Sequence, residues 1–336
     1  MSEPHPRRRR RRHRRNPFAP LLLIVFLLAA LLAGYRILFR EPEAPAQEVP
    51  ETVLPADAAL PSEEEEAAAQ ALRSHYERKE GFYTILVSGV DDGNGGSDTN
   101  ILVAVDSEGQ RVYGVSIPRD TKAYFNGKNH KINAAYNSGG MSMLAEVVSQ
   151  QLGIPVDYTI LVDLRGFEAL VDTIGGVDFT IPVDMDYDDP VQDLHIHFAK
   201  GTAHLSGADA LKVVRYRHNN DGTGYGSEDI GRMQTQQNFL KAVAKQTLTA
   251  SNLTKLDSFV KIFQQYVETD LTLGNLLWLG KTAFAIGPDN IDFATLPGDW
   301  KSPYIYLDQE ATLSVVNTHL NPYVEDRTAE ELQIPD

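Results

Sequence analysis

Three aspartates gather in a glycine-rich stretch directly after an apolar run. Asp91, Asp92 and Asp98 lie between Gly89 and Thr99, among hydroxyl and amide side chains. A loop that leaves the end of a strand is where α/β proteins place ligands. Carboxylates with other oxygen groups suit a hard cation such as Mg²⁺. The three aspartates are therefore candidate Mg²⁺ ligands, although a Gly-Asp turn that only solvates itself has the same pattern.

A single arginine stands at the end of another expected strand. Arg119 follows Pro118, which stops the strand, and precedes Asp120. The planar guanidinium can offer paired N–H groups to a phosphate, and Asp120 could orient it. Lys131 and Asn133 lead into an expected helix start, a natural place for an anion to bind. These residues predict a phosphate-binding site; a surface ion pair at Arg119 is the alternative.

A second group of cations follows later in the chain. Arg215 and Arg217 would share one face only if the chain is extended there, because residues two apart on a helix do not. Arg232 begins an expected helix, and Gln236 lies one turn later on the same side. Such arginine density in an acidic chain needs an anionic partner. Neighbouring acids could also be that partner: Asp221, Glu228 and Asp229.

Two histidines alternate along a further expected strand. His195 and His197 would therefore point to one face. Two histidines make a poor metal site without a third ligand, and the sequence around them does not identify one. The chain has no nucleophile elbow, phosphate-cradling Walker loop, zinc-protease helix or dinucleotide fingerprint.

Charge is distributed unevenly along the chain. The net charge is −15 at pH 7, yet residues 1–16 contain eight arginines and a single acid, so the remainder is more acidic than the total. Domains that bind nucleic acid need a basic face, so the pattern argues against a nucleic-acid partner. There is no cysteine, which excludes disulfides, thiolate catalysis and cysteine-ligated metals.

Residues 18–39 form an apolar stretch that only Arg36 interrupts. A bilayer core of about 30 Å needs about 20 helical residues, and Arg36 near the end can reach the interface. The arginines within residues 1–17 predict a cytoplasmic arm. A cleaved signal peptide is the alternative, but its apolar region is usually shorter. We therefore expect a single-pass transmembrane helix in the cell membrane, with the rest of the chain extracellular.

The remaining sequence predicts one domain behind a linker. Residues 40–61 are rich in Pro, Glu and Ala and predict a solvated linker, and a capping box predicts a helix over residues 62–80. Strands alternating with helices over residues 81–325, before a tail of residues 326–336, predict an α/β fold. We expect an α-β-α sandwich around a central mixed β-sheet. The expected strands are 82–90, 100–106, 111–118, 157–164, 177–182, 194–198 and 291–296, and the expected helices are 141–152, 165–174, 208–214, 232–248, 253–267, 273–285 and 311–320.

Taken together and in this order, these segments resemble the LytR-CpsA-Psr family. The resemblance runs from about Gly81 to Tyr323, behind a membrane anchor of the kind that this family has. The segments that carry it are Ser97-Asp98-Thr99, Val115-Ser116-Ile117-Pro118-Arg119-Asp120-Thr121, Lys131-Ile132-Asn133-Ala134-Ala135-Tyr136, Asp157-Tyr158 through Gly175-Gly176-Val177-Asp178, Val214-Arg215-Tyr216-Arg217-His218, and Asp229-Ile230-Gly231-Arg232 with Gln236-Gln237.

The resemblance implies an extracytoplasmic phosphotransferase of cell-wall biogenesis. Members of this family move anionic glycopolymers, such as teichoic acid or capsule, from a polyprenyl pyrophosphate carrier to the N-acetylmuramic acid 6-hydroxyl of peptidoglycan. A hydrophobic tunnel between sheet and helices would take the prenyl chain. The resemblance implies that Asp98, with Asp91 or Asp92, holds Mg²⁺. It implies that the catalytic residues are Arg119, Asp98 and Arg217. The residues that would contact the pyrophosphate are Arg119, Arg215, Arg217, Arg232 and Gln236.

The sequence departs from the family pattern at two places. The family usually has an arginine directly before Ser-Asp-Thr, where this chain has Gly96, and a second basic residue where Gln234 and Thr235 stand. Each charge-assisted contact is worth roughly 1.5–3 kcal/mol. The loss of two cations leaves two alternatives open, a non-catalytic regulator that binds polyprenyl phosphates and a hydrolase that only cleaves the carrier.

Overall fold

A mixed β-sheet forms the centre of the protein. The computed structural model describes residues 39–45, 74–90, 96–191, 193–225 and 228–335. Six strands follow the order β11-β6-β1-β2-β3-β12; β1 pairs parallel with β6 and β3 with β12, and the other pairs are antiparallel. The strands are β1 (Phe82–Val90), β2 (Ser97–Asp106), β3 (Arg111–Ile117), β6 (Tyr158–Asp163), β11 (Val267–Thr269) and β12 (Ile291–Thr295).

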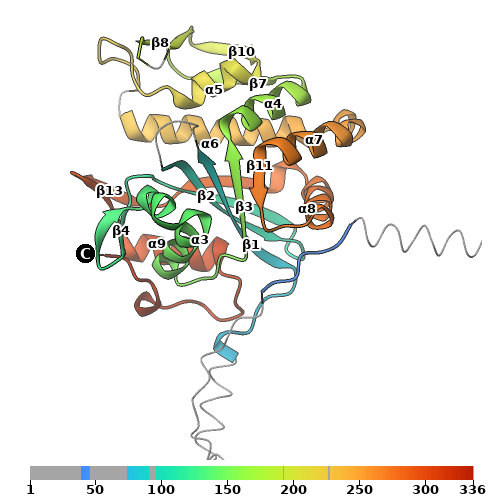
Figure 1. Cartoon of the computed structure of the whole chain (residues 1–336), viewed down its shortest axis with the longest axis vertical. Helices are drawn as coiled ribbons and strands as arrows, with labels where there is room; N and C mark the ends of the chain where they lie inside the picture. Colours follow the sequence, from blue (N-terminus) through green and yellow to red (C-terminus); the bar gives the residue numbers. More distant parts are fainter. Residues whose placement is uncertain (1–38, 46–73, 91–95, 192, 226–227, 336) are drawn as a thin grey trace, which may run out of the picture.

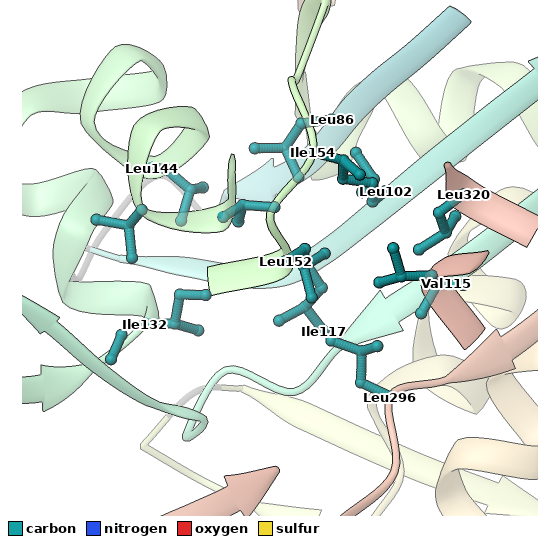
Figure 2. Close-up of a cluster of buried hydrophobic side chains, with 14 of the residues drawn as sticks. Leu86, Leu102, Val115, Ile117, Ile132, Leu144, Leu152, Ile154, Leu296 and Leu320 are labelled. Atoms are coloured by element: carbon teal, nitrogen blue, oxygen red, sulfur yellow. The ribbon is translucent and has the colours of Figure 1, made fainter. Parts of the chain in front are cut away.

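One face of the sheet packs tightly against α3 (Asn133–Leu152) and α9 (Gln309–Val315), which continues as one turn of π-helix (Val316–Leu320). Side chains from neighbouring strands interlock with those of the helices there (Figure 2). Leu86, Leu102 and Val115 are 0% exposed. Alternate residues of β1 to β3 point to this face because successive side chains of a strand point to opposite sides.

The opposite face is covered by α6 (Glu228–Thr247) and α8 (Leu273–Ile286) and is packed less completely. Its buried residues are few, and apolar side chains at the centre of the sheet stay half-buried although helices cover them. These half-buried residues include Val87, Val103, Ile160, Leu279 and Phe293.

A further layer lies beyond α6, at the top of Figure 1. It contains α4 (Leu164–Ile174), α5 (Gly207–Arg215), α7 (Leu256–Tyr266) and two hairpins, β7 (Val177–Ile181) with β10 (Gly201–Leu205) and β8 (Met185–Asp189) with β9 (Leu194–Phe198). Phe239 of α6 is fully buried in the apolar cluster of this layer. Helix α6 therefore serves two cores, one on each of its sides.

Two more hairpins flank the α3 side, β4 (Lys122–Phe125) with β5 (Lys128–Lys131) and β13 (Gly298–Lys301) with β14 (Tyr304–Leu307). Asn126 and Gly127, both with positive φ, make the turn of the first hairpin, as two-residue hairpin loops require. The remaining short helices are 3₁₀ segments at Ala250–Lys255, Pro288–Asn290 and Ala329–Glu331.

The α/β class and the central mixed sheet confirm the expectation from sequence, and the strand over residues 82–90 has the predicted bounds. Helix α3 begins at Asn133 rather than at residue 141, because Gly139 and Gly140 leave helical geometry and interrupt its periodicity. Most of the predicted helix 62–80 and nearly all of the predicted span 18–39 lie outside the described residues. Within residues 74–80, only Ser74 and His75 are helical, and Arg78 forms a β-bridge with Tyr323. Among those described, no helix is long and apolar enough to cross a membrane.

Candidate functional site

One edge of the sheet collects the predicted phosphate-binding segments. Strands β1, β3, β6 and β12 all end at this edge, because β1 and β3 both pair antiparallel with β2 while β6 and β12 run parallel to them. Helix α4 follows directly on β6, and Asp163 caps its first turn. The backbone N–H of Asn133, at the start of α3, donates to the Arg119 carbonyl oxygen over 3.3 Å.

Helix α6 also begins at this edge. Gln237 Nε2 donates to Thr295 Oγ1 over 2.8 Å at the end of β12. One turn later Lys241 Nζ lies 2.6 Å from Asp292 Oδ1, which is three residues earlier in the strand. The helix therefore runs antiparallel to β12, and its N-terminal turn lies at the end of the strand. Helix N-termini favour anions, so α3, α4 and α6 all direct positive potential to one side of the sheet.

Arg119, Asp120 and Lys131 form a charged group beside the start of α3. Lys131 Nζ lies 2.9 Å from Asp120 Oδ1, whereas Arg119 Nε lies 3.9 Å from the same atom. The Arg119 side chain is 40% exposed. Lys131 also lies over the exposed ring of Trp300, 5.9 Å from its centre. Lys131 is therefore the closer partner of Asp120, and the sequence reasoning that made Asp120 orient Arg119 did not identify this pairing.

Gly96 lies against the first turn of α3. Its φ is +125°, and a Cβ placed there would stand 3.4 Å from the Asn133 Nδ2 and 3.7 Å from the Asn137 Nδ2. The residue that replaces the family's arginine thus faces two side-chain amides. Asn137 is an additional polar residue at this edge that the sequence analysis does not select.

Arg215 and Arg217 leave the C-terminal end of α5 on different backbone segments. Arg215 ends the helix, and Tyr216 is extended, with φ −61° and ψ 135°. Arg217 follows it and is exposed. The chain is thus extended only after Arg215. Gln236 Nε2 of α6 donates to the Val214 carbonyl oxygen over 3.0 Å, so this predicted phosphate ligand uses its amide N–H to fasten α5 to α6 beside the two arginines.

Buried tyrosines hold the segment after α5 against α6. Tyr216 is fully buried, and burial raises its pKa to about 12, so the hydroxyl remains a donor to Asn219 Oδ1 at 2.7 Å. Its ring meets that of Tyr225 with the centres 5.3 Å apart. Burial also raises the pKa of Tyr225, and the charge of Arg232 offsets part of this rise. Arg232 therefore acts electrostatically on the cluster that positions Arg217.

The predicted Mg²⁺ ligands are only partly within the described chain. Asp91 and Asp92 lie outside it, and Asp98 is the second residue of β2. Ser97, directly before it, is fully buried, and its Oγ has no hydrogen-bond partner among the described residues. The aspartates themselves offer the carboxylate oxygens that Mg²⁺ prefers.

The two predicted groups are connected through the sheet. Thr295 of β12 pairs with Ser116 of β3, which lies three residues before Arg119. Gln237, which donates a hydrogen bond to Thr295, directly follows Gln236 in α6. The structure therefore places Arg119, Lys131 and Asn133 at one part of the edge and Arg215, Gln236 and Arg232 at the adjoining part. The sequence analysis does not select Gln237 or Thr295; the position of Thr295 at the end of an expected strand is the only available signal.

Residues 55–323 match the LytR_cpsA_psr family. The chain is 35% identical over 244 residues to the polyisoprenyl-teichoic acid–peptidoglycan teichoic acid transferase TagU of Bacillus cereus, an alignment that covers 70% of this chain and 76% of the relative. It is 33% identical over 226 residues to the corresponding transferase TagV of Bacillus subtilis, covering 64% of this chain and 56% of the relative.

Solved structures have the same fold. The crystal structure of Bacillus subtilis TagV superimposes with a TM-score of 0.60 at 29% identity, covering 77% of this chain and 100% of that one. TagT bound to LI-WTA superimposes with a TM-score of 0.55 at 24% identity, covering 72% and 93%, and at that identity it supports the fold alone. The family match and the identity to TagU agree over most of the chain, so the protein belongs to the LytR_cpsA_psr family.

Proposed function

We propose that this protein is a phosphotransferase that moves an anionic glycopolymer from a polyprenyl pyrophosphate carrier to the N-acetylmuramic acid 6-hydroxyl of peptidoglycan. One observation carries the proposal. The sheet edge with the arginines lies beside the apolar face of the sheet that α6 and α8 cover, and this face is incompletely packed. A polyprenyl pyrophosphate has the same two parts, an anionic head and a long apolar chain. The named activities of TagU and TagV are of this kind.

The apolar face suits the lipid part. Val87 and Val103 lie on central strands under covering helices and still remain half-buried, whereas Leu86 and Leu102, on the α3 face of the same two strands, are fully buried. Apolar surface that stays accessible beneath the covering helices favours binding of an apolar ligand. Each Å² of apolar surface removed from water contributes about 25 cal/mol of binding free energy. A prenyl chain inserted between the sheet and these helices would complete the packing.

The sheet edge suits the anionic part. Phosphoryl transfer depends on positioned cations and an in-line acceptor rather than on covalent help from the protein. Arg119, Arg215, Arg217 and Arg232 would hold the pyrophosphate oxygens with the helix starts behind them. Asp98, with Asp91 or Asp92, would hold Mg²⁺, which supplies further neutralisation of phosphate charge. The acceptor oxygen bonds to the polymer-linked phosphorus, the bridging P–O bond to the prenyl phosphate breaks, and the hydroxyl proton passes to water.

The proposal includes a location. A chain anchored by residues 18–39 with residues 40–336 outside the cell would reach both the lipid carrier and the wall. The linker of residues 40–61 would let the domain reach the acceptor glycan. Protease treatment of intact cells tests this orientation, because an external domain is digested and a cytoplasmic one is protected.

A transfer assay tests the function. The full chain is mixed with lipid-linked anionic glycopolymer, peptidoglycan and Mg²⁺, and polymer attached to the wall is measured. Arg119→Ala and Arg217→Ala should each lower transfer at least tenfold, since one charge-assisted contact is worth roughly 1.5–3 kcal/mol. Arg111→Ala is the matched control because Arg111 starts β3 at the end opposite Arg119 and is exposed. Full transfer in either test variant contradicts the role of that arginine.

The same assay separates the alternatives. Gly96 is the observation that favours a non-catalytic regulator, because it removes a cation that the family usually has. Binding of the lipid-linked polymer without attachment to peptidoglycan would support that function. Release of free polymer, with none attached to the wall, would identify a pyrophosphate hydrolase instead.

A further inference from the structure

The β8–β9 hairpin brings a carboxylate to the two alternating histidines. The strands pair Asp188 with His195 and Asp186 with His197, so all four side chains lie on one face of the hairpin. His195 Nδ1 contacts Asp188 Oδ1, and His197 Nε2 lies 3.3 Å from the same oxygen. Asp188, His195 and His197 can each direct one ligand atom so that these atoms lie within 4.8 Å of one another. Asp188 is the third ligand that the sequence does not identify.

One ligand separation fits a tetrahedral metal ion, whereas His195 Nδ1 and Asp188 Oδ1 are in hydrogen-bond contact and would move apart to admit the ion. Ligand atoms at 2.0–2.1 Å from a tetrahedral centre stand roughly 3.3 Å apart, which matches the separation of His197 Nε2 from Asp188 Oδ1. Two imidazole nitrogens and a carboxylate oxygen favour Zn²⁺ over Mg²⁺ or Ca²⁺, which prefer oxygen ligands alone. The half-exposed rings leave a fourth position open to water.

A second observation points to the same ligand atoms. His197 uses its other ring nitrogen, Nδ1, to contact Asp186 Oδ1 at 2.7 Å, and the Nε2 of His195 lies 3.4 Å from Asp193 Oδ1. Each imidazole thus has one nitrogen next to Asp188 and the other held by a different carboxylate. Metal-binding histidines are commonly oriented in this way, because the outer carboxylate fixes the tautomer and ring position and makes the ligand nitrogen more basic.

The hairpin holds these side chains on a fixed backbone. Met185 and Ile196, on its other face, are buried in the core shared with α5 and α6. The side-chain oxygens of Asn219 and Asn220 each accept a backbone N–H of β8 over 2.6 Å, from Asp186 and Asp188 respectively. Little ordering of the backbone is needed when an ion binds, which favours binding.

We propose that Asp188, His195 and His197 form a Zn²⁺ site, separate from the sheet edge, in which Asp186 and Asp193 orient the two imidazoles. The site fastens β8 to β9. Because Asn219 and Asn220 follow closely on Arg217, the metal also restrains the segment that carries this arginine.

Zinc binding to the metal-depleted full chain tests the site by titration calorimetry. The wild type should bind one Zn²⁺ more per chain than the double variant His195→Ala/His197→Ala. His204→Ala is the matched control, because His204 makes the same kind of exposed cross-strand contact, 2.7 Å from Asp178, on the β7–β10 hairpin but without a second histidine. It should retain the wild-type stoichiometry. A double variant that binds as much Zn²⁺ as the wild type overturns the proposal.

Isosteric variants keep the test valid if the double variant fails to fold. Asp186→Asn leaves all three ligands in place and should weaken this Zn²⁺ site roughly 10- to 100-fold, as the loss of an orienting carboxylate does; Asp188→Asn removes a ligand and should weaken it at least as much. Zinc should also raise the thermal unfolding temperature of the wild type more than that of either variant. Unchanged affinity in both variants would show that the three side chains form only surface hydrogen bonds.

Discussion

Lys131 neutralises Asp120 across a 2.9 Å contact, at the point where the β4–β5 hairpin delivers Lys131 next to the end of β3. Arg119 lies further from the same carboxylate, at 3.9 Å. The two cations at this part of the edge therefore differ. Asp120 offsets the charge of Lys131 more closely than that of Arg119.

This difference predicts unequal effects of removing the two charges. Arg119→Met should lower glycopolymer transfer roughly 10- to 100-fold, the equivalent of one charge-assisted contact. Lys131→Met should lower it less, because Lys131 lies 2.9 Å from Asp120, whereas Arg119 Nε lies 3.9 Å from the same oxygen. Rates of transfer under single-turnover conditions compare the two. An equal loss in both variants would show that Lys131 contacts the phosphate directly despite its pairing.

Gly96 is expected to resist restoration of the family's arginine. Its φ of +125° is a conformation that side chains other than glycine rarely adopt, and a Cβ would stand 3.4 Å from Asn133 Nδ2. Gly96→Arg should therefore lower the free energy of unfolding by about 1–3 kcal/mol and should not raise transfer. Urea unfolding at neutral pH measures the stability.

Gly127→Ala provides the comparison for Gly96. Gly127 also has positive φ, +77°, but nothing lies within 4 Å of a Cβ placed there, and it occupies a hairpin turn away from the predicted ligands. This variant should lose stability through backbone conformation alone and retain transfer. A stable Gly96→Arg variant with increased transfer would contradict our account of this loop.

Five of the six strands of the central sheet could be predicted from their apolar sequences, whereas the three-residue strand β11 was not predicted. The segment of β1 is mostly apolar and follows Gly81, and its predicted and observed limits agree. Strand β8 could not be predicted, because Met185–Asp189 has only two inward apolar residues among three aspartates and reads as a loop. Its partner β9 supplies the pairing that makes it a strand.

The site could be predicted in its residue types but not in its pairings. Arginines placed directly after strand ends or at helix starts are visible in sequence, and Arg119 is one of them. The choice of Asp120 for Lys131 depends on the β4–β5 hairpin, whose charged outer residues hide the strand pattern. Likewise, Asp188 meets His195 only through cross-strand register. Contacts set by tertiary pairing have no local signature.

Arg78 and Asp157 should make a large contribution to stability. Both Asp157 oxygens accept from the Arg78 guanidinium, over 2.8 and 2.7 Å, and one also accepts the Thr84 backbone N–H over 2.9 Å. The Asp157 side chain is 1% exposed. Asp157→Asn removes the carboxylate charge and leaves Arg78 without its ion pair. Breaking a buried pair from one side costs about 3–5 kcal/mol, which chemical unfolding would detect.

Arg111→Met is the matched control for this pair. Arg111 is exposed and lies 3.9 Å from Asp106, and exposed ion pairs contribute about 0–1 kcal/mol. If Asp157→Asn loses no more stability than Arg111→Met, the buried pair does not fasten the start of β1 to β6 as its geometry indicates.

His75 should make the protein less stable as the pH rises above 6.5. It lies 2.8 Å from Glu331 and 3.1 Å from Glu325 and joins the segment before β1 to the C-terminal residues. These hydrogen bonds, first that with Glu331 and then that with Glu325, raise its pKa above the ordinary value of 6.5. The free energy of unfolding that the charged ring contributes is fully present below pH 6.5 and is lost as the pH rises through the folded-state pKa.

His319 should act in the opposite direction and in a different pH range. Its ring stacks on Tyr113 with the centres 3.7 Å apart, and burial lowers its pKa below 6.5. The stability contributed by this neutral ring is therefore present above pH 6.5 and is lost as the pH falls through the folded-state pKa. Urea unfolding from about pH 5 to pH 8.5 separates the two histidines. His75→Gln should reduce the loss of unfolding free energy on the alkaline side, and His319→Gln should reduce the loss on the acidic side. Both effects concern the slope with pH and do not depend on the stability of the variant at pH 6.5. A variant with the wild-type pH profile would show that the replaced ring has the same pKa in the folded and unfolded states.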